Sequence, residues 1–175
     1  MYSESIVLPP YEVYKDCFYY GQWNRGQKHG YGKLYFPDKS AYSGEFNNGK
    51  AEGKGRLFHP NGDIYVGDWR NDKAHGYGRY LSASKAVFEG QWENDMRSGH
   101  GKEVWPDGTI FEGEYSGNKK NGKGKFRWAN GNEYVGEFRD NHKNGQGVMK
   151  YSDGRQFKGN WLNDQMHGEG EFIWP

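Results

Sequence analysis

Cysteine is almost absent from this chain, and so is any long hydrophobic run. The single Cys17 cannot form a disulfide within the chain, which favours a reducing compartment. No run of about 18 apolar residues is present, so no transmembrane helix is predicted. The acidic start, Met1–Pro10, lacks the basic character of a signal peptide. These absences predict a cytoplasmic protein.

An excess of charge of one sign is also missing. The chain has 24 basic and 23 acidic residues, interspersed along its length, with a formal net charge of +1. Such a balance gives little long-range attraction to nucleic acid or to anionic lipid. Nucleic acid is therefore not expected as a partner.

Convergent catalytic and metal-binding residues are lacking as well. The histidines have no cysteine or second histidine at ligand spacing, and the carboxylates are spread along the chain instead of converging. His29, His75 and His167 share one repeat position, which indicates a structural role. Gly-x-Gly elements without a following helix do not predict a nucleotide loop. The sequence predicts a protein that is not an enzyme, with no catalytic residues, cofactor or metal.

Aromatic residues and glycine are abundant, and both recur with a fixed period. Aromatics make up 18% of the chain, and there are 28 glycines among its 175 residues. An aromatic–x–Gly–x–aromatic pentad recurs every 23 residues, starting at Tyr19, Tyr42, Tyr65, Phe88, Phe111, Tyr134 and Phe157. A Gly-x-Gly element follows each pentad, as at Gly30/Gly32. Strict periodicity is typical of repeat architectures, in which each unit contacts mainly its neighbours.

Each repeat is predicted to form two short antiparallel strands. The pentad alternates in character as a strand does, and the Gly-x-Gly segment gives the second strand. Asn-Gly or Asp-Gly pairs, as at Asn61-Gly62, predict type I′ turns, whereas Asp38-Lys39 and Ser84-Lys85 predict another or looser turn. Seven repeats then give about fourteen strands in a meander.

The two faces of the predicted sheet differ in character. Tyr19, Gly21 and Trp23 share one face with Gly30, Gly32, Leu34 and Phe36 of the next strand, so that rings lie over glycine backbone. The other face carries acids and bases in neighbouring strands, with expected pairs Glu45–Arg56, Asp68–Arg79 and Glu114–Lys125.

The ends of the chain differ from the repeats. Residues 1–18 are expected to form an N-terminal tail, flexible over Met1–Leu8, and a capping strand at Tyr11–Tyr14 that covers the sheet edge. Residues 19–175 are expected to form the repeat array, whose last unit is incomplete at Trp174-Pro175. A truncation, or completion by a partner or a second copy, would explain that end.

The pentad, the Gly-x-Gly element and the Asp-Gly turn together resemble the MORN (membrane occupation and recognition nexus) repeat. Close matches include Lys28-His29-Gly30-Tyr31-Gly32 and Ala74-His75-Gly76-Tyr77-Gly78. The resemblance implies an all-β fold: an elongated, twisted rod made of a single-layer antiparallel meander of stacked hairpins, with an aromatic-lined groove. It also implies scaffolding at the cytoskeleton, at cilia or at membrane junctions, and phospholipid binding has been attributed to the family.

Two rows of rings are the candidates for binding a protein partner. The first row contains the last aromatic of each pentad, and the second row contains the aromatics that end the second strands. A helix or extended peptide laid along them would cover an otherwise exposed apolar strip. The alternative for the first row is packing in the core. The candidate residues are Phe36, Trp69, Trp92, Trp105, Trp128, Tyr151, Trp161 and Trp174.

The second row is interrupted between about residues 59 and 86, where His59 and Ser82 replace aromatics. The interruption is consistent with a bend, with a partner-specific notch or with simple tolerance.

Two further functions are weighed against the protein scaffold. A basic cluster, Lys119, Lys120, Lys123 and Lys125, is the candidate for lipid binding, although nearby acids oppose it. A homodimer through the open ends or the aromatic faces is the other alternative. The function predicted first is a noncatalytic adaptor in a cytoskeletal or ciliary assembly.

Overall fold

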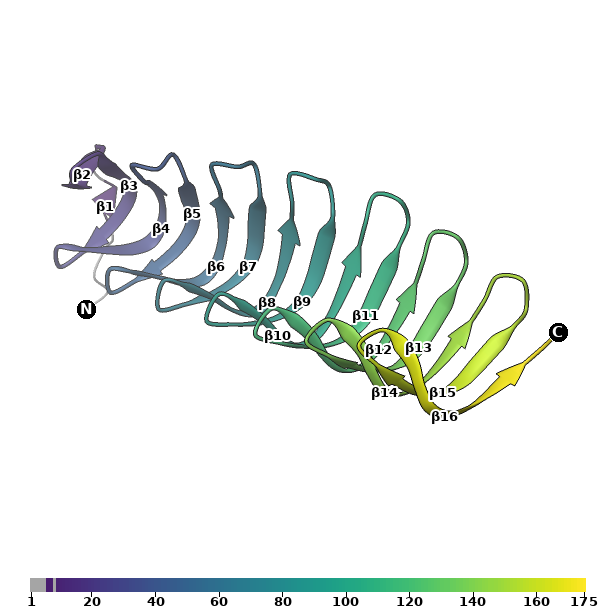
Figure 1. The fold of residues 1–175 in the computed structure, drawn as a ribbon. Coiled ribbons are helices and arrows are strands. Elements are labelled where there is room, and N and C mark those ends of the chain that lie inside the picture. The colour runs from purple at the N-terminus through teal and green to yellow at the C-terminus, as the bar shows by residue number, and fades with distance from the viewer. Residues whose placement is uncertain (1–5, 8) are drawn as a thin grey trace. The chain divides into compact units, whose positions relative to one another are not determined.

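The computed structural model describes residues 6–7 and 9–175, and their side chains from residue 9 onward. The predicted flexible tail, Met1–Leu8, lies outside the described residues except for Ile6–Val7. Figure 1 shows the strands in succession along the chain. The chain divides into two compact units. The N-terminal unit contains Met1–Ala83 and Trp92–Asp95, and the C-terminal unit contains Ser84–Gln91 and Met96–Pro175.

Each unit is an antiparallel meander whose strands follow one another in chain order, apart from β2, which pairs with β3 beside this path. The described residues include no helix. The predicted all-β meander of hairpins is thereby confirmed within each unit. The strands are β1 Ile6–Val7, β2 Tyr11–Tyr14, β3 Cys17–Asn24, β4 Gln27–Tyr35, β5 Ala41–Asn47, β6 Lys50–Phe58, β7 Ile64–Arg70, β8 Lys73–Leu81, β9 Val87–Glu93, β10 Met96–Val104, β11 Ile110–Ser116, β12 Lys119–Arg127, β13 Glu133–Arg139, β14 His142–Lys150, β15 Gln156–Leu162 and β16 Gln165–Ile173.

The turns within the repeats differ from the prediction. The two-residue turns with positive φ at both residues follow the pentads, as at Asn71 (50°) and Asp72 (64°), and this is the type I′ geometry. In the Asp-Gly turns only the glycine has positive φ, for example Gly108 at 88°. The Gly108 N–H donates to the Trp105 carbonyl (3.0 Å), which describes a longer loop built on a type I turn.

In the two turns that lack glycine, the residue at the glycine position also adopts a left-handed backbone conformation. Lys39 (φ 72°) and Lys85 (φ 71°) occupy it, and the Lys39 N–H donates to the Phe36 carbonyl over 3.0 Å, as glycine does elsewhere. The expectation of a different or looser turn at Asp38-Lys39 and Ser84-Lys85 is wrong, because a single left-handed residue costs a lysine little enough for the surrounding hairpin to hold it.

A bulge also corrects the predicted register in the hairpins β3–β4, β5–β6, β7–β8, β11–β12, β13–β14 and β15–β16. In β5 and β6, Gly44 pairs with Gly55, but the next ladder pair is Phe46 with Ala51, so Glu45 faces a bulge. Glu45 Oε1 accepts the Lys54 N–H (3.1 Å), and Asp68 Oδ2 accepts the Tyr77 N–H (2.9 Å).

The expected ion pairs are therefore wrong. Arg56 lies opposite Ser43 and Val66, and Arg79 lies opposite Val66. Asp68 forms an ion pair with Lys54. The bulge also turns the first glycine of Gly-x-Gly away from the rings, because a Cβ at Gly53 would meet the Glu45 carboxylate instead.

Rings over glycine form the core, as predicted. The Tyr65 ring lies over Gly67 and Gly78, and its hydroxyl donates to the Asp68 carbonyl (2.9 Å). Edge-to-face contacts then link neighbouring repeats: Tyr42 contacts Phe46 at 5.1 Å and Trp69 at 4.9 Å between ring centroids. This ladder replaces the aliphatic core that the composition lacks.

A strand lies at Tyr11–Tyr14, where the sequence predicts one. This strand, β2, pairs with β3 through Tyr11–Tyr19 and Glu12–Phe18. The Tyr11 ring meets Trp23 edge-on at 5.4 Å. Its role as a cap, and the boundary at residue 18, stay predictions.

Candidate binding surface on the aromatic face

The first row of rings lies in the core. Trp69 is 7% exposed, and Trp92 and Trp161 are equally buried. The indole N–H groups of Trp92 and Trp161 donate to the carbonyls of Gly78 (3.2 Å) and Gly147 (3.3 Å). These three candidate residues therefore support the surface from below and leave little ring area for a partner.

The second row lies nearer the surface. Phe36, Trp105, Trp128 and Tyr151 are half-buried, and Trp174 is 68% exposed. In the C-terminal unit this row continues through rings that the sequence analysis did not select. Phe126 lies 5.7 Å from Trp105 and 4.6 Å from Trp128, and Phe172 lies 6.2 Å from Tyr151 and 5.0 Å from Trp174.

One further repeat position belongs to the aromatic face, and the sequence analysis missed it. It opens the second strand and pairs with the last aromatic of the pentad, as Lys28 does with Trp23 and Ala51 with Phe46. The tight turn places it there, because the second strand begins three residues before the Gly-x-Gly segment from which it was predicted. The signal that could have identified this position is an alignment of the repeats at their 23-residue period. This cation column contains Lys28, Ala51, Ala74, Arg97, Lys120, Lys143 and Met166.

Cations of this column lie over rings in both units. In the N-terminal unit, Lys28 Nζ is 5.2 Å from the Phe46 ring centroid. Lys120 Nζ is 5.2 Å from the Trp105 ring centroid and 5.1 Å from that of Phe111. Its ammonium is 3.7 Å from a Glu103 carboxylate oxygen. Burial lowers the pKa of Lys120, and the Glu103 charge opposes that shift. Lys143 Nζ lies 4.5 Å from the Trp161 centroid. Each contact is a cation–π interaction in which the chain supplies both partners.

Two consecutive repeats of the N-terminal unit have alanine in this column, and a hollow lies at each. The hollow at Ala51 has a volume of about 300 Å³, and the hollow at Ala74 has about 400 Å³. Leu57, Trp69 and Asp72 line both. Most of the remaining walls are rings: Tyr42, Phe46, Phe36 and Tyr14 in the first, and Tyr65, Tyr80, Trp92 and His59 in the second. The first hollow is also lined by Leu34 and by Lys28, whose Nζ lies 5.2 Å from the Phe46 ring centroid.

Carboxylates lie beside both hollows. Asp72 Oδ1 accepts the Ala51 N–H (2.7 Å), and Asp95 Oδ1 accepts the Ala74 N–H (2.8 Å). Within the described part of the chain, neither carboxylate has a cationic group within 4.0 Å. Each hollow thus combines aromatic walls with a carboxylate that forms no ion pair in the described residues, and the hollow at Ala51 has Lys28 in its wall as well.

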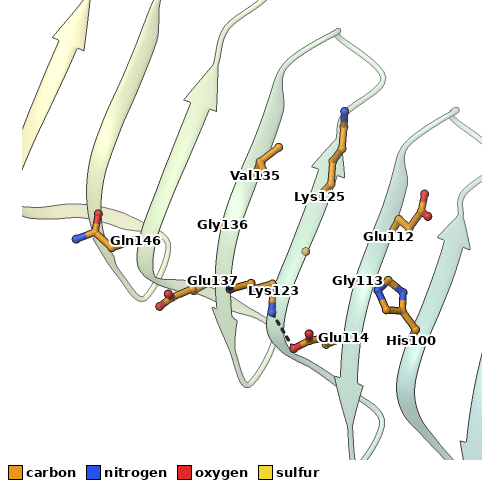
Figure 2. Close-up of a pocket in the computed structure, with 11 residues that line it drawn as sticks. His100, Glu112, Gly113, Glu114, Lys123, Lys125, Val135, Gly136, Glu137 and Gln146 are labelled. Carbon is orange, nitrogen blue, oxygen red and sulfur yellow. Dashed lines mark hydrogen bonds between the residues drawn. The ribbon is translucent and has the colours of Figure 1, made fainter.

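The face opposite the rings is charged. A hollow of about 670 Å³ lies there in the C-terminal unit, lined by His100, Glu112, Glu114, Lys123 and Lys125 among others. Figure 2 shows these lining residues. The Lys123 N–H donates to Glu114 across its bulge (3.1 Å). Three glutamates and two lysines line this hollow, so it has no basic excess.

The structure separates the four lysines of the lipid candidate. Lys123 and Lys125 line the charged face, and Lys125 pairs with Glu133 at 3.0 Å. Lys119 pairs with Asp140 at 3.2 Å, and Lys120 lies among the rings of the aromatic face. Adjacent strand residues point to opposite faces, which is why Lys119 and Lys120 part.

Metal ligands do not cluster among residues 6–7 and 9–175: no group of three or more His, Cys, Asp or Glu side chains is placed to hold an ion. In the same residues, no helix is long and apolar enough to cross a membrane.

Solved structures with a similar fold include a Drosophila melanogaster SAS-4 (dCPAP) TCP domain in complex with a proline-rich motif of Ana2 (dSTIL). It has a TM-score of 0.50 at 15% identity, over 83% of this chain and 85% of that chain. The TCP10c domain of Drosophila melanogaster Sas-4 has a TM-score of 0.42 at 14% identity, over 83% and 93%. A mutant TCP10 domain of Danio rerio CPAP has 0.38 at 13%, over 90% and 83%. At 15% identity, the similarity between this chain and the first structure concerns the fold alone.

The curated proteins contain no significant match to this chain. The model of the MORN repeat matches residues 19–41, 42–64, 65–87, 88–110, 111–133, 134–154 and 157–175. These seven matches coincide with the seven pentad-and-glycine units whose rings build the aromatic face. The chain belongs to the MORN repeat family.

Proposed function

We propose that this chain is a noncatalytic scaffold or adaptor that binds an extended segment of a partner protein along its aromatic face. The observation that carries the proposal is the second row of the C-terminal unit, where Trp105, Phe126 and Trp128 form a continuous half-buried surface of stacked rings. Rings of this kind bury large areas on binding and lose few rotamers.

An open sheet with a row of rings across its strands supports an extended ligand over a small molecule. Aromatic-lined grooves recognise peptides that lie along them, and the ring row runs across successive strands. The TCP domain with a similar fold was solved in complex with a proline-rich motif of Ana2, which supports a peptide segment as the kind of partner. A place in a cytoskeletal or ciliary assembly is the corresponding proposal for this chain.

The test is selection of binding peptides from a displayed library of extended sequences, followed by affinity measurement. Trp105→Ala with Trp128→Ala is expected to weaken the selected peptides at least tenfold, the loss typical of interface ring anchors. The fold should persist, because both rings lie above the buried ladder. Selected peptides that bind the folded double variant as tightly as the parent would refute this surface.

Two controls separate the alternative functions. Vesicles that contain an anionic phospholipid should not bind the chain more tightly than neutral vesicles, because the charged face has no basic excess. Light scattering over a range of concentrations should give a mass near 20.2 kDa. A concentration-dependent dimer that competes with the peptides would favour self-assembly instead.

A further inference from the structure

We propose that the hollows at Ala51 and Ala74 each receive a lysine or arginine side chain of the partner, which takes the place of the cations that other repeats supply themselves. The inference rests on the proposed function and specifies what the partner must carry. It predicts two basic side chains on one extended segment.

The repeat that contains Lys120 shows how a cationic side chain contacts the rings at this position. The column places Ala74 and Ala51 at the position of Lys120, so Tyr65 and Tyr42 stand where Phe111 does, and Trp69 and Phe46 stand where Tyr115 does. Lys120 Nζ lies 5.1 Å from Phe111 and 6.0 Å from Tyr115. With alanine at this position the ring walls remain, and a hollow is left at each alanine. The hollow at Ala51 lies beside Lys28 of the preceding repeat, which contacts Phe46 from its own position in the column.

In these repeats a side chain 21 residues further along the chain caps the column residue by accepting its backbone N–H. The type of that capping residue differs between the alanine repeats and the repeats of Arg97 and Lys120. The Arg97 and Lys120 amides are capped by neutral Asn118 (2.8 Å) and Asn141 (2.8 Å). The Ala51 and Ala74 amides are capped by charged Asp72 and Asp95. At Arg97 and Lys120 the cap is thus an amide, and at both alanines it is an acid. For Lys28 the equivalent position is Gly49, which has no side chain to act as a cap.

Lys143 is the exception and supports the same reading. Its amide is capped by Asp164 (2.8 Å), but that carboxylate already contacts His142 Nδ1 at 2.6 Å. An acidic cap beside a cation thus has a further partner, whereas Asp72 and Asp95 have only their amide contacts among the residues that the structure describes. Their charge complements a basic group.

The distance between the two hollows favours an extended backbone conformation in the partner segment. Ala51 lies in β6 and Ala74 in β8, with β7 between them. Two strand spacings are about 9.5 Å. One turn of polyproline II spans three residues and about 9.3 Å. An extended segment that crosses the strands would therefore present residues i and i+3 to the two hollows.

The experiment uses the full chain, isotope-labelled for NMR, and the probe acetyl-Gly-Pro-Arg-Pro-Pro-Arg-Pro-Gly-amide. Shifts are expected for the amides and indoles around Ala51, Trp69 and Ala74. A probe with norleucine in place of both arginines should bind roughly tenfold more weakly, because two charge pairs are lost. Equal binding of the norleucine probe, no binding of the arginine probe, or shifts confined to other repeats would overturn the inference.

Two variants match repeats that the chain already contains. Asp72→Asn with Asp95→Asn keeps both amide caps, as Asn118 and Asn141 do, and should weaken the arginine probe roughly tenfold. Ala51→Lys with Ala74→Lys copies Lys120 and should abolish binding by filling both hollows. Unchanged affinity in either folded variant would overturn the inference.

The two proposals fail separately. Library peptides that depend on Trp105 and Trp128, together with an arginine probe that does not bind, would leave the scaffold function standing and remove only the basic anchors. Failure of both sets of peptides would remove the scaffold function as well.

Discussion

At Gly67 and Gly78 the absence of a side chain makes room for the Tyr65 ring. A Cβ added at Gly67 would lie 2.7 Å from the Tyr65 hydroxyl oxygen and 2.5 Å from the Tyr77 carbonyl oxygen. Neither neighbour can withdraw, because the ring is 2% exposed and the carbonyl belongs to the sheet backbone. A residue that weakens most strands is therefore required at this point.

Gly78→Val is expected to lower the free energy of unfolding by about 2–3 kcal/mol, because the added side chain displaces a buried ring. Urea unfolding followed by tryptophan fluorescence measures the loss. Gly49→Asn is the matched control, since a Cβ there meets no atom within 4 Å and asparagine already occupies that turn position at Asn118 and Asn141. The control should change stability by less than about 0.5 kcal/mol. A Gly78 variant as stable as the control would contradict the ring-on-glycine account.

At the scale of the hairpin, the bulge decides which side chains face the rings. The residue before the last pentad aromatic spans the bulge and accepts a backbone N–H on the next strand: Gln22 from Tyr31 (2.8 Å) and Gln91 from His100 (2.8 Å), as well as Glu45 from Lys54 (3.1 Å). Glutamine and glutamate serve alike, so the oxygen matters and the charge does not.

Glu45→Ala should therefore cost about 1 kcal/mol of unfolding free energy, the net worth of one hydrogen bond, and should speed hydrogen exchange of the Lys54 amide. Glu45→Gln should retain both the stability and the slow exchange of the Lys54 amide, because Gln22 and Gln91 accept the equivalent hydrogen bond in their own repeats. Equal losses in the two variants would show that the carboxylate charge matters at the bulge, contrary to this account.

For the molecule as a whole, stability depends on a buried ladder of phenols and phenyl rings. Burial raises the pKa of Tyr19 to about 12 and that of Tyr134 to about 12, above the ordinary value of 10.0. Because the folded chain holds these protons more tightly than the unfolded chain, their contribution is fully present below pH 10. It is lost as the pH rises through about 12.

Urea unfolding midpoints should consequently fall between about pH 9.5 and 11.5. A variant with Tyr19→Phe and Tyr134→Phe should show a shallower fall, since Phe88, Phe111 and Phe157 hold the same repeat position without an ionisable group. A fall of the same steepness in both proteins would assign the alkaline loss to other groups.

Much of the fold and part of the site follow from the repeat pattern. The period, the strand pairs and the rings over glycine were predictable, since alternation and the glycine spacing act locally. The bulge registers and the type I′ turns were not, because an extra residue in one strand leaves the hydrophobic pattern almost unchanged. The second-row rings were identified from sequence as binding candidates and stay so, whereas the cation column was missed.

The sequence by itself thus determined the repeat, its family and an all-β architecture with one aromatic face. Only the tertiary structure decided that Trp69, Trp92 and Trp161 are core and that Lys120 and Lys123 belong to opposite faces. It also decided that Ala51 and Ala74 open hollows beside acids. The reason is physical: a bulge reverses which face a side chain occupies, and a hollow exists only where the packing of several strands leaves one.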